Sequence, residues 1–337
     1  MKKILLLMMA LGCMMAAQGQ NDVVTATLQH GNELTVFKMA NALSDAYNAA
    51  VDGDVITLSE GTFNAITINK SITIYGAGYE ENEVTGTRLT RINGDVNIAY
   101  QNSDTISSIH IEGCYFAGKI YVGGKNGWNY TFLTSLCIRN CWVNNDLCIY
   151  RPVGDVVLTN NVLNGVYGSS FALTSLLIQN CCIYNQVNNF PALSPIIVDH
   201  CVIQCVINYS TSGAYYYTND IFLSTNSSAC LATGANVRNC LFRFDYNALL
   251  SVFAENCYIA NSGIFSDIEN SNDGTYVMNR TWALQQPDVW VGNDGTPIGP
   301  IGGLGWSTTP RIPVINSLEL NVQGSQLLIN YDAEVRE

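Results

Sequence analysis

The segment Leu176-Leu-Ile-Gln-Asn-Cys-Cys-Ile183 contains the pattern that decides the fold: apolar, any, apolar, any, Asn, Cys, any, apolar. Close copies occupy residues 109–116, 136–143, 156–163 and 196–203, and weaker copies occupy residues 235–242 and 252–259. The Cys position falls at residues 114, 141, 161, 181, 201, 240 and 257, so the commonest step is 20 residues. The longer interval after Cys201 is close to two steps, and we expect a degenerate copy at Ile221–Asn226 within it.

Each copy predicts two short strands joined by a bend at the Asn, because alternating apolar residues point to one side of a strand. Asn tolerates the left-handed backbone that such a corner requires, and Gly113 and His200 take its place in two copies. A step of 20 residues is too short for a propeller blade, and the repeat lacks the leucine pattern of a horseshoe-shaped leucine-rich repeat. The sequence therefore predicts an all-β solenoid, a parallel β-helix. Its expected core residues are Ile109, Ile111, Leu136, Ile138, Val156, Leu158, Leu176, Ile178, Ile196 and Val198.

The stretches Asn41-Ala-Leu-Ser-Asp-Ala-Tyr-Asn-Ala-Ala-Val-Asp-Gly-Asp-Val-Ile-Thr-Leu-Ser-Glu-Gly-Thr-Phe-Asn64 and Ile66-Thr-Ile-Asn-Lys-Ser-Ile-Thr-Ile-Tyr-Gly-Ala-Gly78 resemble the opening of pectin-lyase-like proteins. The resemblance implies a right-handed parallel β-helix that begins with a short capping helix. Leu43, Ala46, Tyr47 and Ala50 would share the buried face of that helix. We expect the β-helix and its N-terminal cap to span residues 21–270.

The repeat fades after Asp267, and residues 271–337 are predicted to form a β-rich C-terminal tail that caps the far end or lies back along the rod. Within it, residues 294–303 resemble a closing segment of secreted bacterial β-helix proteins of unassigned function.

The beginning of the chain predicts export. Met1-Lys2-Lys3 and the apolar run from Ile4 to Ala17 are typical of a signal peptide, which we place at residues 1–20. Leu11-Gly12-Cys13 also resembles a bacterial lipobox, so Cys13 is a candidate lipid anchor. No later stretch is apolar enough for a transmembrane span. The expected location is secreted, periplasmic or on the outer surface of a Gram-negative-type bacterium.

Charge narrows the range of partners. The chain has 15 Lys and Arg against 27 Asp and Glu, a net charge of -12. Nucleic acid is not expected as a partner, because its binding relies on clustered basic residues. A neutral polysaccharide or cell-surface glycan fits this charge better than an anionic one.

Cysteines recur at one position of the repeat, which predicts buried free thiols at Cys141, Cys181, Cys201 and Cys240. Parallel stacking keeps the Cβ atoms of neighbouring coils near the strand separation of about 4.8 Å, which is longer than a disulfide prefers.

Catalytic motifs are sparse. Asp199-His200 resembles part of a pectate lyase segment, and Arg151 is a candidate basic partner, but the bend of the repeat also accounts for His200. The Gly-His-Gly and Arg-Ile-Lys segments of polygalacturonase-type hydrolases are absent. No metal site is predicted from spacing, although stacked turn carboxylates leave Ca²⁺ open as a cofactor. The carboxylates that we expect in or near turns, mostly in contact with solvent, are Asp146, Asp155, Asp220, Asp245, Glu255, Asp267 and Glu269.

Aromatic residues supply the candidate ligand-binding positions. Tyr115, Trp142 and Tyr258 follow the Cys position and should point outward, whereas Tyr150, Tyr121 and the run Tyr215–Tyr217 are expected in turns. Outward rings can stack on sugars, or they can pack beneath loops and the tail.

Three hypotheses follow. The first is a surface β-helix that binds carbohydrate or serves surface display without a recognisable catalytic motif. The second is an enzyme, a polysaccharide lyase or glycoside hydrolase, and the third is a structural or adhesive rod. Catalysis itself stays undecided from the sequence.

Overall fold

The computed structural model describes residues 24–335 except 82–87, 100–104, 124–131, 152, 170–172, 186, 191–193, 205–213, 225–230, 232–233, 247–252, 268–279, 310–312 and 324–325. For residues 313–335 it describes the backbone alone. The predicted signal peptide and Cys13 lie outside the described residues. Within the described residues, no helix is long and apolar enough to cross a bilayer.

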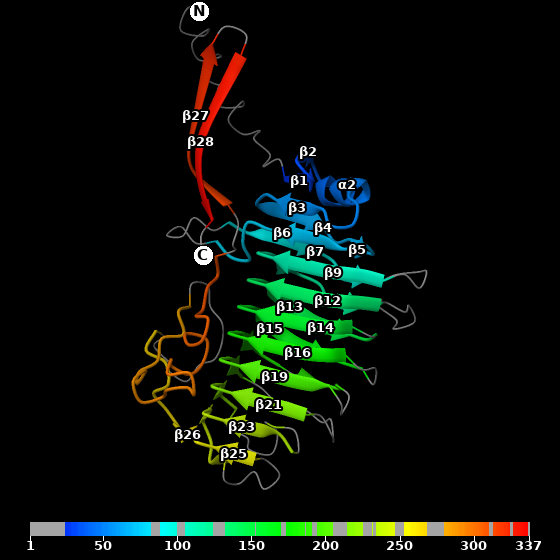
Figure 1. The fold of residues 1–337 in the computed structure, drawn as a ribbon. Helices are drawn as coiled ribbons and strands as arrows, with labels where there is room; N and C mark the ends of the chain where they lie inside the picture. The colour runs from blue at the N-terminus through cyan, green and yellow to red at the C-terminus, as the bar shows by residue number, and fades with distance from the viewer. Residues whose placement is uncertain are drawn as a thin grey trace, which may run out of the picture.

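Two long sheets form an elongated stack, and nearly all of their strand pairs are parallel (Figure 1). The twelve-stranded sheet has the order β2 (Glu33–Lys38), β1 (Thr25–His30), β3 (Val55–Leu58), β6 (Ile72–Tyr75), β9 (Thr105–Glu112), β12 (Phe132–Arg139), β14 (Val153–Thr159), β16 (Leu173–Gln179), β19 (Pro195–Asp199), β21 (Ala214–Thr218), β23 (Asn236–Arg238) and β25 (Phe253–Glu255). The fourteen-stranded sheet contains β4 (Gly61–Asn64), β7 (Thr90–Asn93), β10 (Tyr115–Phe116), β13 (Trp142–Ile149), β15 (Val162–Tyr167), β17 (Cys182–Ile183), β20 (Val202–Ile203), β22 (Ile221–Phe222), β24 (Leu241–Phe242) and β26 (Tyr258–Ile259), with β5 (Thr67–Ile68), β8 (Val96–Ile98), β11 (Ile120–Val122) and β18 (Val187–Asn188) beside them. Successive coils therefore add strands to both sheets, as in a β-helix-like solenoid.

The predicted register of the repeat is confirmed. All ten predicted core residues are at most 1 % exposed and belong to one hydrophobic cluster between the sheets. The Asn of the bend has a left-handed backbone, with φ from 46° at Asn140 to 60° at Asn219, and His200 has the same conformation.

One coil has a different register from the prediction. Its first strand is β21, its bend is Asn219, and Asp220 takes the Cys position, so Ile221–Asn226 is not a copy of the template. Tyr215 and Tyr217 pair with Ile196 and Val198 and are 1 % exposed, so they fill the core instead of lying in a turn. Tyrosine in place of an aliphatic residue hid this copy.

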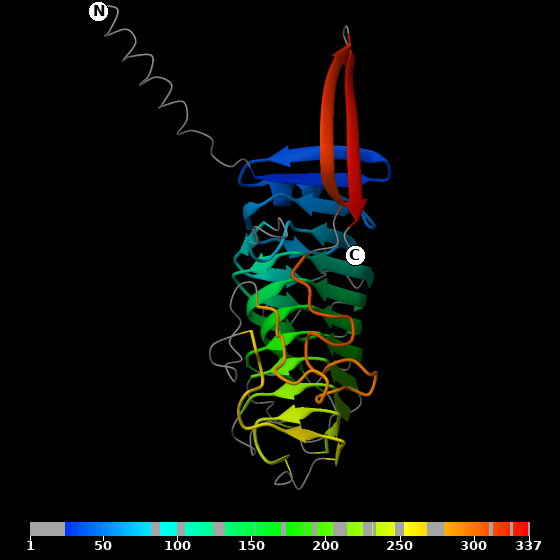
Figure 2. The same cartoon turned by 90° about the vertical axis from the view of Figure 1, so that its left-hand side faces the viewer.

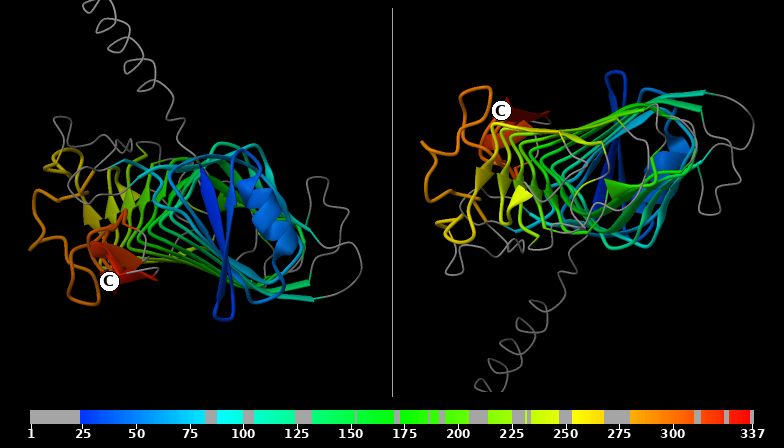
Figure 3. Two further views of the ribbon diagram at one scale, coloured as in Figure 1. Left: turned by 90° about the horizontal axis from the view of Figure 1, so that it is seen from above. Right: turned by 90° about the horizontal axis from the view of Figure 1, so that it is seen from below.

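The helix α2 (Ala42–Ala49) forms where the capping helix was predicted, and Leu43, Ala46, Tyr47 and Ala50 are buried. Figure 3 shows α2 and the hairpin β1–β2 across one end of the stack. This hairpin was not predicted. It pairs antiparallel with β3 and extends the twelve-stranded sheet beyond the first coil.

The C-terminal region is divided into two parts. Residues 280–309, the tail segment, run back along one side of the stack (Figure 2). The antiparallel hairpin of β27 (Pro313–Gln323) and β28 (Gln326–Val335) follows, near the end that carries β1 and β2. The expected β-rich tail is present. At the far end, however, Ile259 of β26 is 45 % exposed although its in-register neighbour Phe242 is buried in the core, so among the described residues the tail covers the side of the rod instead of that end.

Candidate functional site

The bend of the repeat is where the tail segment docks. The Nδ2 atom of Asn180 donates hydrogen bonds to the carbonyl oxygens of Pro300 (2.8 Å) and Gly302 (2.6 Å). Asn140 donates in the same way to the carbonyl of Thr309, at 2.9 Å. A left-handed bend turns these amides outward, and the tail segment uses their hydrogen-bonding capacity.

His200, a predicted catalytic candidate, takes part in the same docking. It is 1 % exposed, and its Nε2 atom lies 3.1 Å from Thr296 Oγ1 and 3.4 Å from Asp294 Oδ2. Its Nδ1 atom lies 3.1 Å from Asp199 Oδ1. Gly303 packs so closely over the ring that a Cβ there would lie 2.9 Å from Nδ1. A polymeric substrate therefore has no access to His200 in this arrangement.

Arg151 is not brought to Asp199. It precedes β14, whereas Asp199 aligns through β16 with Thr159 at the other end of β14. That strand has seven residues, so the two positions are separated by roughly 20 Å along it. The pair predicted for lyase chemistry does not form a site.

Three of the four predicted aromatic positions lie on the outer face of the fourteen-stranded sheet. Tyr115 and Trp142 pair in register and meet edge to face, with ring centroids 5.3 Å apart, and Tyr258 donates a hydrogen bond to the Val291 carbonyl at 3.1 Å. All three are partly buried against a second hydrophobic cluster. Between them, the outward residues Val162, Cys182, Val202, Ile221 and Leu241 are fully buried in the cluster that also contains Trp282, Leu284, Trp290 and Ile298 of the tail segment.

The fourth aromatic position, Tyr150, lies at a different place, directly after β13, a strand that contains a β-bulge. Val143 pairs with Leu163 and Asp146 with Gly165, so β13 has one residue more than β15 between these pairs. Bulges redirect side chains and are frequent next to functional sites. The side chains gathered here, which we call the bulge cluster, are Asp95, Lys119, Tyr121, Asp146, Tyr150 and Asn164.

An ion pair organises the bulge cluster. Lys119 Nζ lies 2.6 Å from Asp146 Oδ2, and the other oxygen of Asp146 accepts a hydrogen bond from Asn164 Nδ2 at 3.0 Å. Asp95 Oδ1 accepts a hydrogen bond from the Lys119 backbone N–H, also at 3.0 Å. Both oxygens of Asp146 are therefore used, although the sequence predicted a solvated turn carboxylate.

Two tyrosines border this ion pair. The ring centroids of Tyr121 and Tyr150 are 6.1 Å apart. Tyr121 is 8 % exposed, and Tyr150 is half-buried. Burial, together with a hydrogen bond to Cys148, raises the pKa of Tyr150 to about 12. The hydrogen bond with Asp146 raises the pKa of Lys119. Neither group is a base at neutral pH, because both keep their protons.

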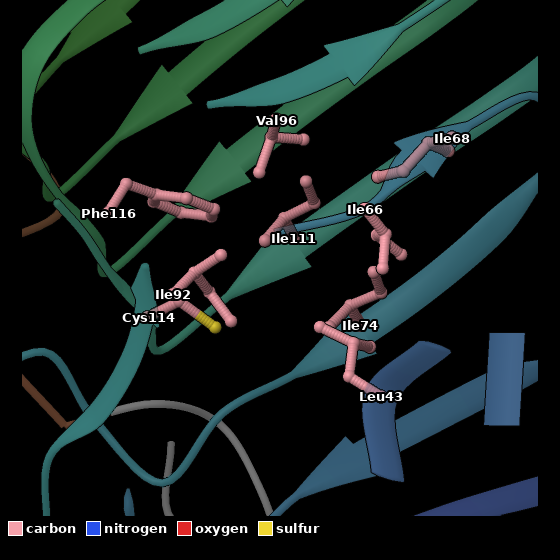
Figure 4. Close-up of a pocket in the computed structure, with 9 residues that line it drawn as sticks. All are labelled: Leu43, Ile66, Ile68, Ile74, Ile92, Val96, Ile111, Cys114 and Phe116. Atoms are coloured by element: carbon pink, nitrogen blue, oxygen red, sulfur yellow. The ribbon is translucent and has the colours of Figure 1, made fainter. Parts of the chain in front are cut away.

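Two cavities lie away from the bulge cluster. The first is enclosed by core residues of the first coils, among them Leu43, Ile74 and Phe116 (Figure 4), and holds only about 10 Å³. Its apolar lining gives a water molecule no polar partners, so it is a packing gap. The second is an open hollow of about 440 Å³ at the start of β12, β14 and β16, with the exposed Phe132 on its rim.

The sequence pointed to Tyr150, Tyr121 and Asp146 individually but did not indicate that they meet. Lys119 and Asp95 were missed, and the interruption of alternation at Asn144-Asn145 is the signal that could have indicated a bulge. Among the described residues, no three His, Cys, Asp or Glu side chains are grouped to hold a metal ion. Comparison of the chain with family models, curated proteins and solved structures found no match.

Proposed function

We propose that this chain is an exported or surface-bound right-handed parallel β-helix of the pectin-lyase-like kind, and that it binds a neutral polysaccharide or cell-surface glycan at the bulge cluster. The observation that carries the proposal is the half-buried Tyr150 ring, 6.1 Å from the Tyr121 ring and within electrostatic reach of the Lys119 ammonium group that pairs with Asp146. A sugar presents an apolar face and a rim of hydroxyl groups. The ring can stack on the face, while ammonium, carboxylate and amide groups exchange hydrogen bonds with the hydroxyls.

Binding is a better account of this cluster than catalysis. A lyase needs a base near neutral pH, but the raised pKa values of Lys119 and Tyr150 keep both protonated. A hydrolase needs a protonated carboxylic acid, whereas Asp146 pairs with an ammonium group. The polysaccharide lyase or glycoside hydrolase is therefore the second candidate, and an adhesive rod the third.

The test is a panel of neutral and acidic polysaccharides, scored for retention of the protein and for release of unsaturated or reducing products. We expect retention by a neutral glycan without product release. Tyr150→Ala should weaken binding roughly three- to tenfold, since an aromatic contact contributes about 0.5–1.5 kcal/mol.

The matched control is Tyr216→Ala, the same substitution at a tyrosine that is 44 % exposed on the other sheet. Equal binding by both variants would refute the assignment of the bulge cluster. Product release would favour the enzyme, and no retention by any glycan would leave the adhesive rod.

A further inference from the structure

Three reactive side chains meet on the outer face of the twelve-stranded sheet, away from the bulge cluster. Because Ile109 and Ile111 point inward, His110 and Glu112 of β9 point outward. Cys137 of the next strand, β12, pairs in register with His110. Adjacent parallel strands are about 4.8 Å apart, so this pairing places the thiol next to the imidazole.

Glu112 holds the imidazole in place. Its Oε2 atom lies 3.1 Å from His110 Nε2, and its side chain is only 3 % exposed. The other oxygen accepts a hydrogen bond from Asn140 Nδ2 at 3.1 Å and lies 4.0 Å from Arg139 Nε. The carboxylate is therefore fixed by the bend of the repeat, and it orients the ring toward the neighbouring strand.

The imidazole is charged at neutral pH. Burial lowers the pKa of His110, but hydrogen bonds with Cys137 and Glu112 outweigh burial and raise this pKa to about 9. The other groups facing the ring are Arg139, beside Glu112, and Tyr75 of β6, whose ring centroid is 5.6 Å away. An imidazolium beside a thiol stabilises the thiolate, which is the nucleophilic form of cysteine.

Cys137 differs from the cysteines of the repeat. Cys114, Cys141, Cys181, Cys201 and Cys240 are buried in the core, and burial raises the pKa of Cys114 to about 12. Cys137 is partly exposed. Its in-register neighbours are His110 and Val157, so neither flanking strand offers a second thiol at this position.

We propose that Cys137 is a reactive thiol that takes a covalent modification from small disulfides, with His110 as the paired cation and Glu112 as the positioning residue. In this step the Cys137 thiolate attacks one sulfur of the disulfide. The S–S bond of the reagent breaks, a mixed disulfide forms on Cys137, and the other half leaves as a thiolate that takes a proton from solvent. Cys137 is oxidised and half of the reagent is reduced. The proposal does not depend on glycan binding.

The test uses the folded full chain, with oxidised glutathione as the disulfide and iodoacetamide as an alkylating probe, and peptide mass mapping locates the label. Cys257 is the internal control, because it is also partly exposed but its thiol has its pKa raised by burial. We expect Cys137 to be labelled at least about tenfold faster than Cys257 at pH 7. The product with glutathione at Cys137 should be a mixed disulfide.

Two variants separate reactivity from simple exposure. His110→Gln should slow labelling of Cys137 about tenfold at pH 7 and move its profile of rate against pH toward higher pH, because the neighbouring cation is lost. Glu112→Gln should give a smaller decrease, and circular dichroism confirms that each variant is folded. Labelling of Cys137 no faster than Cys257, or an unchanged rate in folded His110→Gln, would overturn the proposal.

Discussion

Asp220 is a carboxyl group inside the core, and its replacement by Asn should stabilise the protein at neutral pH. Asp220 is fully buried at the Cys position of its coil. Its Oδ1 atom accepts a hydrogen bond from the Cys201 backbone N–H at 2.7 Å, while Oδ2 has no hydrogen-bond partner. Burial raises the pKa of Asp220 well above its ordinary value of 3.8.

The same position three coils of the repeat earlier shows what an amide would do. Asn161 accepts a hydrogen bond from the Cys141 backbone N–H at 2.9 Å, and its Nδ2 atom donates to the Ile138 carbonyl at 2.7 Å. An Asn at residue 220 can repeat both interactions. Its Nδ2 atom would replace the unpaired Oδ2 atom of Asp220 and donate a hydrogen bond. This should raise the free energy of unfolding by about 1 kcal/mol.

The larger effect depends on pH. Since the pKa is higher in the folded state than in the unfolded chain, the stability of the wild type is fully present below pH 3.8 and decreases as pH rises toward the folded pKa of Asp220. The loss is about 1.4 kcal/mol for each pH unit in this interval. Asp220→Asn does not ionise, so its advantage over the wild type should increase by that amount per unit.

Urea unfolding of both proteins at half-unit steps from pH 4 to pH 8 measures this difference. Asp155→Asn is the matched control, because Asp155 is exposed and accepts a hydrogen bond from Ser175 Oγ. That control measures what the same substitution does at an exposed carboxylate. Parallel curves for Asp220→Asn and wild type, or a less stable Asp220→Asn at pH 7, would show that the carboxyl is not a buried acid.

The remaining predictions concern the core, the bend and the tail. Ile178→Ala should cost about 2–5 kcal/mol in unfolding free energy, because Ile178 is fully buried, and a loss below 1 kcal/mol would contradict the core register. Thiol counting on denatured protein without reductant should find Cys181 and Cys201 mostly reactive, whereas a disulfide between them would show that stacked strands accept the bond. His200→Ala should destabilise the protein by about 1–3 kcal/mol, since it loses the Thr296 hydrogen bond and strains a left-handed position. Asp199→Ala should not abolish any eliminase activity. Eliminase activity that is lost in a folded Asp199→Ala variant would support the lyase hypothesis instead. Trp290→Ala should expose the tail segment to limited proteolysis while the repeat stays protected, and equal protection of both regions would show that Trp290 does not hold the tail.

The fold was predictable wherever the repeat places aliphatic residues on the inside. Ile138, Leu158, Ile178 and Val198 follow a strict alternation, and each is fully buried. The coil with Tyr215 escaped detection because aromatic residues there suggested an exposed turn. These rings are buried because they fill the interior of this coil in place of aliphatic side chains. Tyr217 packs edge to face against Phe222, with ring centroids 5.5 Å apart.

The candidate sites were less predictable because they depend on contacts between distant segments. Asn180 meets Gly302 across 122 residues of sequence, and nothing local to either residue indicates the pairing. His110 and Cys137 are 27 residues apart, whereas the usual step of the repeat is 20. They pair in register only because the longer coil still aligns its strand with the next one. Periodicity predicts which side of a strand a residue takes. It does not predict which loop or tail will cover that side.

The position of the tail segment decides which faces a ligand can reach. Its Trp282, Trp290 and Ile298 pack in one cluster with the outward residues in the middle of the fourteen-stranded sheet. Of the two uses that the sequence left open for Tyr115, Trp142 and Tyr258, the structure therefore shows packing against this cluster. Tyr150 directly follows the strand that contains Trp142, beyond the bulge, but it belongs to a different cluster and is half-buried. A glycan that binds this sheet past the bulge would avoid the middle of the outer face, which the tail segment already covers.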